Sequence, residues 1–129
     1  MKIRILFQLI LFTAVSALAH HGFSQFDMEK NVTYVGTVLE YRWENPHTHI
    51  ILKVEPSAPD QPILGNWDIE CQSIPIMFRQ GWTKESYKPG DKITIVAHPM
   101  RNGIRGATIF YAIQSDGSRL YGDVARPKN

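Results

Sequence analysis

The sequence of 129 residues contains one cysteine, Cys71, so no disulfide can form within the chain. Packing of apolar side chains must therefore stabilise the fold, and we predict that Cys71 is a buried, inert thiol on a strand. The chain also lacks a serine in a nucleophile-elbow context and a glycine-rich phosphate loop, and its carboxylates are spread singly along the chain. We expect a binding protein rather than an enzyme, with copper-dependent redox chemistry as the remaining enzymatic alternative.

Only one long apolar run is present, and it lies near the start of the chain. The run extends from Ile5 to Leu18, it follows the basic residues Lys2 and Arg4, and Ala17 and Ala19 supply small residues before a cut after position 19. It is shorter than the ~20 apolar residues of a comfortable membrane span. We predict that residues 1–19 are a cleavable signal peptide and that the mature protein is periplasmic or secreted, with an uncleaved anchor as the alternative.

The predicted mature chain has no excess charge of either sign. The full sequence has 14 Lys+Arg and 12 Asp+Glu, and the signal peptide contains two of the basic residues, Lys2 and Arg4. The 110 residues that remain would carry 12 charges of each sign. A neutral domain has no electrostatic attraction for nucleic acid or for an anionic membrane, so we expect neither as a partner.

Apolar and polar residues alternate through most of the remaining chain, as is typical of strands. We expect a polar arm over residues 20–31, a folded domain over 32–124 and a loose tail over 125–129. A short helix is expected over 73–80, capped by Ser73. The expected strands are Val32–Trp43 with a bulge at Gly36, His47–Glu55, Gly65–Gln72, Lys92–His98 and Ala107–Gln114, followed by an edge pairing at Leu120-Tyr121.

This order of elements points to one architecture. Five strands with a short helix between the third and the fourth are the arrangement of the oligonucleotide/oligosaccharide-binding (OB) fold. We therefore predict an all-β protein with one short helix, built as a five-stranded OB-like barrel. A small β-sandwich is the alternative.

Six short segments of the chain carry a resemblance to a known family. They are His20-His21-Gly22-Phe23, Phe26-Asp27, Gly36-Thr37-Val38, Trp43-Glu44-Asn45-Pro46-His47, Arg79-Gln80-Gly81-Trp82-Thr83 and Lys88-Pro89-Gly90-Asp91. Through these segments the chain resembles the domain of unknown function 6152 family of small exported bacterial proteins. It departs from the family pattern at His49, where an aromatic residue is expected. The resemblance implies the fold and the export, and it implies no activity.

Four of the five histidines suggest a metal site. His20 would begin the mature chain, where its α-amine and its imidazole can chelate one ion. His47 and His49 are expected on one face of a strand, with Cα atoms about 7 Å apart, and His98 ends another strand. Nitrogen-rich ligand sets suit Cu(II), and this one resembles the histidine brace of copper proteins whose mature chains begin with histidine. We predict a copper site at His20, His47, His49 and His98, provided that the arm and these strand ends share one end of the barrel.

The arm must be ordered for such a site to form. We expect Phe23 and Phe26 to fix it to the barrel by burying their rings, and Asp27 to accept a hydrogen bond from a histidine ring. Because the amine has an ordinary pKa of about 8 and must be deprotonated to bind, metal binding would depend on pH.

The same residues have plainer alternatives. His20 can follow the signal without contacts, His47 can be a turn residue bonded to a backbone carbonyl, and His98 can be a polar residue at a strand end. The three tryptophans can stack on a planar ligand instead. The alternative function is therefore a metal-free periplasmic module that binds a protein or a small ligand.

Overall fold

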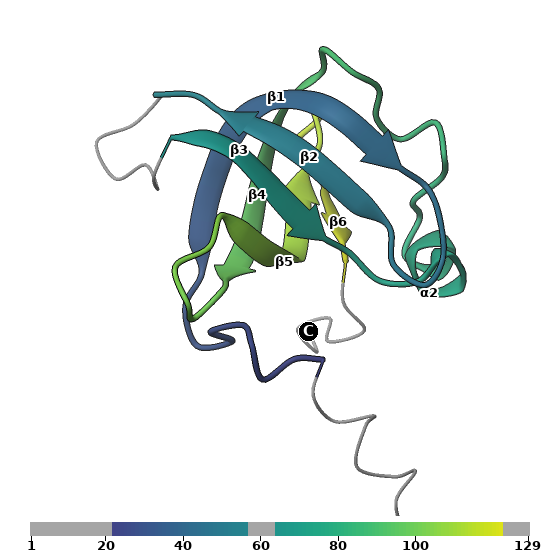
Figure 1. The fold of residues 1–129 in the computed structure, drawn as a ribbon. Coiled ribbons are helices and arrows are strands. Elements are labelled where there is room, and N and C mark those ends of the chain that lie inside the picture. The colour runs from purple at the N-terminus through teal and green to yellow at the C-terminus, as the bar shows by residue number, and fades with distance from the viewer. Residues whose placement is uncertain (1–21, 57–63, 123–129) are drawn as a thin grey trace, which may run out of the picture.

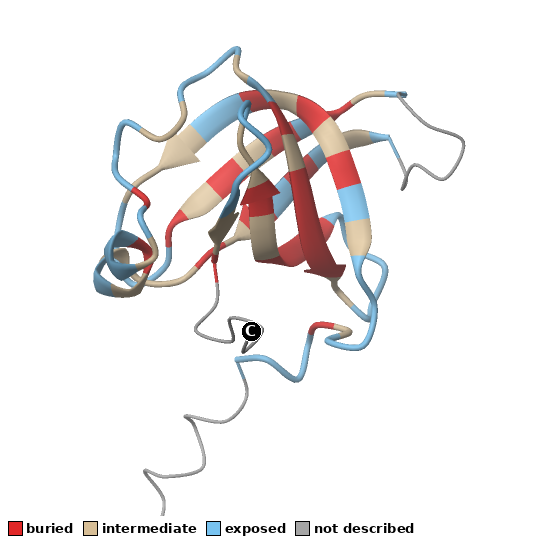
Figure 2. Ribbon diagram, turned by 180° about the vertical axis from the view of Figure 1, so that it is seen from behind, coloured by how far each residue is buried: buried red, intermediate tan, exposed pale blue. Residues whose placement is uncertain are grey.

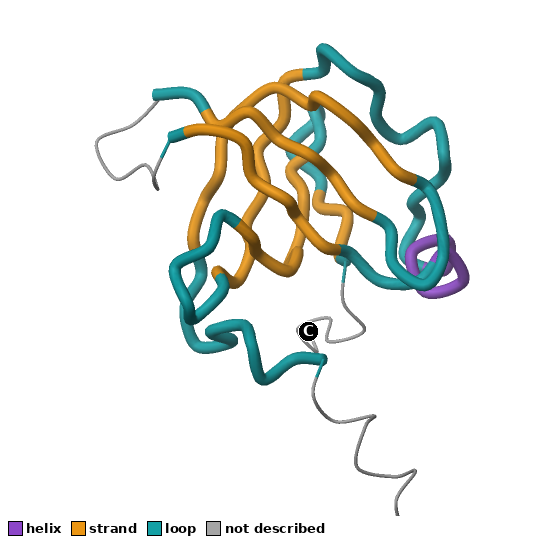
Figure 3. The backbone as a smooth tube through the Cα atoms, in the orientation of Figure 1, coloured by secondary structure: helices purple, strands orange, loops and turns teal. Residues whose placement is uncertain are grey.

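The computed structural model describes residues 22–56 and 64–122, in which six strands and one helix follow one another along the chain (Figures 1 and 3). They are β1 (Val32–Arg42), β2 (His49–Val54), β3 (Gly65–Glu70), α2 (Ile74–Arg79), β4 (Lys92–Pro99), β5 (Gly106–Ile113) and β6 (Arg119–Tyr121). None of the helical structure in this part of the chain is long and apolar enough to cross a membrane. The predicted signal peptide, His20 and the predicted tail lie outside the described residues.

Five of these strands close into a barrel. Neighbours in the order β3-β2-β1-β4-β5 are antiparallel, and β3 also pairs with β5 in the parallel sense, which closes the sheet. The three closing pairs are Asp68–Gly106, Ile69–Ala107 and Glu70–Thr108. β6 extends the sheet from β5, as the expected edge pairing. The predicted five-stranded OB-like barrel with its helix between the third and fourth strands is confirmed, and the β-sandwich is not formed.

The long strand β1 takes part in both halves of the barrel, pairing with β2 and with β4. A bulge was predicted at Gly36. The register of β1 with β2 instead shifts between Val38 and Glu40, a few residues further along the strand. Gly36 has a different role. A Cβ atom at this position would collide with the carbonyl oxygen of Lys53, so only glycine permits β1 and β2 to approach this closely.

Buried and less buried residues alternate along much of the strands (Figure 2), as expected when one face of the sheet is turned to the inside of the barrel. The buried apolar residues of the strands include Tyr34 and Val38 of β1, Ile50, Leu52 and Val54 of β2, Trp67 and Ile69 of β3, Ile93, Ile95 and Ala97 of β4, and Ala107, Ile109 and Ala112 of β5. Cys71 belongs to the same core with 1% of its surface exposed, which confirms the predicted burial. Burial also raises the pKa of its thiol, so the reactive thiolate is disfavoured.

The helix α2 lies beside the end of β1 and the start of β2 (Figure 1). Met77 in α2 and Trp82 just after it are both fully buried in the core. The predicted cap, Ser73, is the N-cap residue, but its side chain makes no capping hydrogen bond. Instead, the backbone N–H of Ile74 donates to the side-chain oxygen of Asn45 at 3.0 Å. The β1–β2 connection therefore holds the start of the helix.

The arm docks on the connection that follows β4. Phe26 forms a β-bridge with Met100 and has only 3% of its surface exposed. Both Phe23 and Phe26 were predicted to fix the arm to the barrel. Phe23 has 51% of its surface exposed, so only Phe26 has this role. Two backbone hydrogen bonds flank the bridge, from Asp27 N–H to Pro99 O at 2.8 Å and from Arg101 N–H to Gln25 O at 2.9 Å.

Candidate functional site

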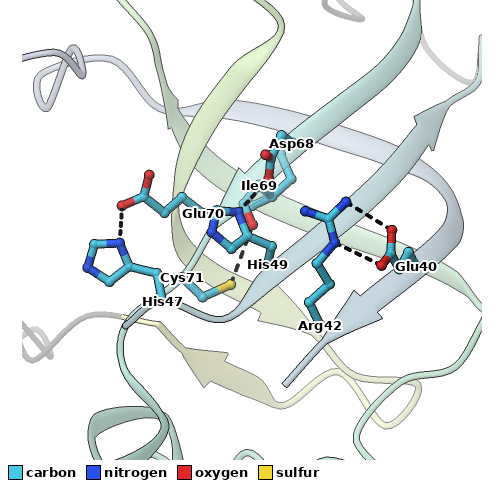
Figure 4. Close-up of polar contacts among 8 residues, drawn as sticks. All are labelled: Glu40, Arg42, His47, His49, Asp68, Ile69, Glu70 and Cys71. Atoms are coloured by element: carbon cyan, nitrogen blue, oxygen red, sulfur yellow. Dashed lines mark hydrogen bonds and ion pairs between the residues drawn. The ribbon is translucent and has the colours of Figure 1, made fainter. Parts of the chain in front are cut away.

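Two of the predicted metal ligands, His47 and His49, lie on the same outer face of the barrel, each bonded to a carboxylate of β3 (Figure 4). His47 Nδ1 is 2.8 Å from Glu70 Oε1, and His49 Nδ1 is 2.7 Å from Asp68 Oδ1. Asp68 and Glu70 are two positions apart on β3 and so project from one face. The predicted common face of the two histidines follows from these contacts, although β2 begins only at His49.

The hydrogen bonds define which ring nitrogen is free. A carboxylate oxygen accepts, so Nδ1 of His49 is the donor, and in the neutral imidazole Nε2 of that ring then carries the lone pair. Nδ1 of His47 likewise is the ring nitrogen that faces a carboxylate. The hydrogen bond to Asp68 raises the pKa of His49, while partial burial of the ring opposes the shift. Arg42, the neighbour of His49 across the strands, is itself paired with Glu40 at 2.8 Å. Histidines that ligate metals commonly have this arrangement, with the second nitrogen bonded to a carboxylate.

His98 lies apart from this pair. Across the sheet, His49 is opposite Glu70, Glu70 is opposite Thr108, and Thr108 is opposite His98. Three strand spacings therefore separate the two histidines, or about 14 Å measured along the sheet. The His98 ring is 8% exposed, lies 5.5 Å from the Phe110 ring, and its Nδ1 donates to the carbonyl of Lys30 at 3.0 Å. In these contacts His98 holds the end of the arm against the barrel.

The described residues supply only part of the predicted ligand set. Over 22–56 and 64–122, no group of three or more His, Cys, Asp and Glu side chains is arranged to hold a metal ion. His20 lies outside these ranges. Asp27, expected to orient a histidine, instead lies 3.6 Å from the Arg101 guanidinium.

A small pocket connects the arm with the histidine–carboxylate pairs. It has a volume of about 170 Å³ and is lined by both Asp68 and Glu70 and also by Phe26 and Met100. The carboxylates that orient His49 and His47 and the anchor of the arm therefore share one surface depression. Met100 contributes the bridge to Phe26 here.

The tryptophans do not form an exposed stacking platform in the described part of the chain. Trp67 and Trp82 have 5% and 0% of their surface exposed, and Trp43 packs partly buried against the same core. Trp82 also donates from its indole nitrogen to the carbonyl of Tyr121 at 2.8 Å. Their role is to fill the barrel.

Sequence reasoning missed the carboxylate partners of the histidines. Asp68 and Glu70 alternate with Trp67 and Ile69 along β3, so the period of two already assigned the two carboxylates to the outer face. Cys71, which was predicted on the strand, follows directly after its end. What the sequence did not give was the register of β2 against β3, in which His49 lies opposite Glu70 and Ile51 lies opposite Asp68. This register brings the acidic and basic side chains together.

Comparison with known proteins gives a family and no described relative. Neither the curated proteins nor the solved structures contain a significant match to the chain. A family model does match, and its description is that of a family of unknown function, DUF6152. The match extends over residues 9–109 and so covers most of the chain, which therefore belongs to the DUF6152 family.

Proposed function

We propose that this chain is an exported β-barrel protein that binds a copper ion, with the amine and imidazole of a processed His20 and the Nε2 atoms of His47 and His49 as ligands. The observation that carries the proposal is that Nδ1 of each ring lies against a carboxylate, as a hydrogen bond from His49 to Asp68 and as a close contact of His47 with Glu70. With Nδ1 facing a carboxylate in both rings, Nε2 is the nitrogen available to a metal.

The electrostatics of the pairs suit a divalent cation. Glu70 and Asp68 bring two negative charges next to the two rings, and Arg42 is already engaged by Glu40. A bound Cu(II) ion would be balanced by these carboxylates without contacting them. Nitrogen ligands are also the preferred class for this ion.

The length of the arm permits His20 to reach the pairs. Phe26 lines the same 170 Å³ pocket as Asp68 and Glu70. Five residues lie between His20 and Phe26, and an extended chain spans at most about 3.3–3.6 Å per residue. An arm of this length can extend about 20 Å from Phe26, which lines the pocket together with the carboxylates that contact the two histidines.

A copper titration of the processed protein, beginning at His20, tests this function. We expect stoichiometric Cu(II) binding by calorimetry and a nitrogen-rich paramagnetic resonance spectrum. The double variant His47→Gln, His49→Gln should lower the affinity by about 100-fold or more, and an additional glycine before His20, which removes the amine from its position, should do the same. His21→Gln is the matched control and should bind as the parent does. Unchanged binding when His20 and both barrel histidines are replaced together would refute the copper assignment.

The second candidate is a metal-free module that binds a small ligand. A separate observation favours it, namely a larger pocket of about 320 Å³ at the end of the barrel where β1 begins. Its lining residues include Val32, Pro99 and Ile104, and the buried residues Tyr34 and Trp67 lie at its base. Binding of a small molecule by protein treated with a chelator would support this function independently of copper.

A further inference from the structure

The connection between β4 and β5 contains the sequence pair Asn102-Gly103 on the surface of the protein. All residues from 101 to 105 are exposed, so water reaches the pair freely. Gly103 has a φ of 76°, and a Cβ atom built there would meet no other atom within 4 Å. Because Gly103 has no side chain and open surroundings, nothing shields its backbone nitrogen from the neighbouring side-chain amide.

The hydrogen bonds of this turn favour attack on the Asn102 side chain. The backbone N–H of Ile104 donates to Oδ1 of Asn102 at 3.1 Å. This bond polarises the side-chain carbonyl and would stabilise the negative charge that develops on the oxygen when a nucleophile attacks Cγ. The N–H of Gly103 donates to the carbonyl of Met100 at 3.4 Å, which is a long and weak bond. The nitrogen of Gly103 is therefore only weakly held, and its closure onto Cγ forms a five-membered ring.

We propose that Asn102 is a site of spontaneous deamidation and that its products weaken the docking of the arm. The nitrogen of Gly103 gives its proton to a solvent base and bonds to Cγ of Asn102. The bond from Cγ to Nδ2 breaks, and Nδ2 leaves as ammonia. Water then opens the resulting succinimide, at Cγ to give aspartate or at the backbone carbonyl to give isoaspartate. The steps need only water, and no oxidant or reductant takes part.

The other asparagines of the described ranges lack this combination. Asn31 and Asn66 precede Val32 of β1 and Trp67 of β3, which are strand residues with bulky side chains. Asn45 precedes Pro46, which has no N–H to attack with. Asn102 is therefore expected to react first among these four.

Asp116-Gly117 is a turn of similar sequence with a different outcome. The carboxylate of Asp116 accepts hydrogen bonds from the N–H and the hydroxyl of Ser118, at 2.8 and 2.6 Å. These bonds lower the pKa of Asp116 and so favour its ionised form. An ionised carboxylate is a poor electrophile, so this turn should form little isoaspartate and supplies an internal reference.

The turn that contains Asn102 also holds the arm (Figure 1). Met100 forms the β-bridge with Phe26, and the N–H of Arg101 donates to the carbonyl of Gln25 at 2.9 Å. Isoaspartate would add a methylene group to the backbone directly after Arg101, and either product adds a carboxylate there. Both changes act on the segment that binds the arm. The inference goes beyond the proposed function and requires no metal.

The test begins with incubation of the processed, metal-free protein near neutral pH, followed by peptide mapping with mass spectrometry. We expect the peptide that contains Asn102 to gain one mass unit about tenfold faster, or more, than the peptides that contain Asn31 and Asn66. Enzymatic methylation should label isoaspartate in the same peptide and leave the Asp116 peptide unlabelled. The rate should increase with pH, because the attacking nitrogen must lose its proton.

Hydrogen exchange then measures the effect on the arm. Anion-exchange chromatography separates the deamidated protein by its added charge, and residues 25–31 of this fraction should exchange about 5-fold faster or more, with unchanged protection in β2 and β3. Asn102→Gln is the matched control, because a six-membered ring closes much more slowly, and it should give no second fraction. Asn102→Asp supplies the charge without the methylene group and should loosen the arm less.

Two results would overturn the proposal. Deamidation of Asn102 at the same rate as Asn31 and Asn66 would refute the site. A deamidated fraction whose arm exchanges as in the parent would refute the effect on docking. Both measurements use metal-free protein, so their failure is distinct from a failure of the copper titration.

Discussion

His49 and Asp68 form a titratable pair on the outer face of two neighbouring strands. Because the hydrogen bond favours the protonated ring, it raises the pKa of His49, and replacement of Asp68 by Asn should lower that pKa. A raised pKa in the folded state stabilises the protein most at pH values below the unfolded pKa of about 6.5, and this contribution is lost as the pH rises through the folded value. The destabilisation of Asp68→Asn should therefore be larger at pH 5 than at pH 8. NMR titration of the His49 ring and denaturation at both pH values measure the two effects.

Asp116→Asn is a suitable control for that experiment. Asp116 bonds Ser118 in the turn before β6 and has no contact with the histidine pair. The titration of His49 should be the same in this variant as in the parent. An equal response to both substitutions would mean that overall charge, and not the hydrogen bond to Asp68, determines the pKa of His49.

The buried Tyr34 and the partly buried Tyr41 should respond in opposite ways to loss of the hydroxyl. The Tyr34 hydroxyl has no partner among the described residues, whereas the Tyr41 hydroxyl donates to the carbonyl of Thr83 at 3.0 Å. In the absence of ligand, Tyr34→Phe should raise the free energy of unfolding by about 1 kcal/mol, and Tyr41→Phe should lower it by about 1 kcal/mol. Urea denaturation measures both. A loss of stability in Tyr34→Phe would show that the hydroxyl has a bound partner such as water.

At the scale of elements, α2 begins at a hydrogen bond that comes from another part of the chain. Asn45 accepts from the N–H of Ile74, while the side chain of the N-cap residue Ser73 makes no capping bond. Asn45→Ala should therefore cost about 1 kcal/mol of stability. Ser73→Ala is the matched control and should cost much less. Thermal unfolding compares the two, and the reverse order would return the capping role to Ser73.

The strands were predicted closely because their alternation is a local property of the sequence. The burial of Trp67 and Ile69 on one face of β3, and of Cys71 directly after it, follows from a period of two. The partners of each strand are not local. The contact of Asn45 with α2, the shift of register beyond Val38 and the pairing of Asp68 with His49 all join segments that are distant in the sequence. Hydrophobic patterning specifies a face, and it does not specify which residue lies opposite.

At the scale of the whole molecule, the arm is a separate part, and of its two aromatic rings only that of Phe26 is buried. Phe26→Ala should release the arm while the barrel stays folded, because the strands do not depend on this side chain for their pairing. The loss of stability should be at most about 3 kcal/mol, less than for a core aromatic, since the arm can detach. Hydrogen exchange should show new exposure of residues 25–31 with unchanged protection in β2 and β3.

Phe23→Ala is the matched control for the arm. Its ring is half exposed, so the substitution should leave the exchange pattern nearly as it is. If Phe26→Ala unfolds the barrel as well, the arm is an integral part of the core. The general architecture was predictable from the order of elements, but the route of the arm was not, because nothing local in the sequence distinguishes Phe26 from Phe23.

The parallel contact between β3 and β5 has a consequence for biosynthesis. The barrel closes only when Gly106, Ala107 and Thr108 of β5 pair with β3. During synthesis, β1 can pair with β4 only shortly before this step, because β4 directly precedes β5 in the chain. A chain that is still being synthesised has β1, β2 and β3 complete, but its sheet has two unpaired edge strands. Unpaired edge strands can pair with other chains. We therefore expect truncated forms that end near residue 105 to aggregate. Nascent chains of the same length should depend on a chaperone until β5 and β6 have been synthesised.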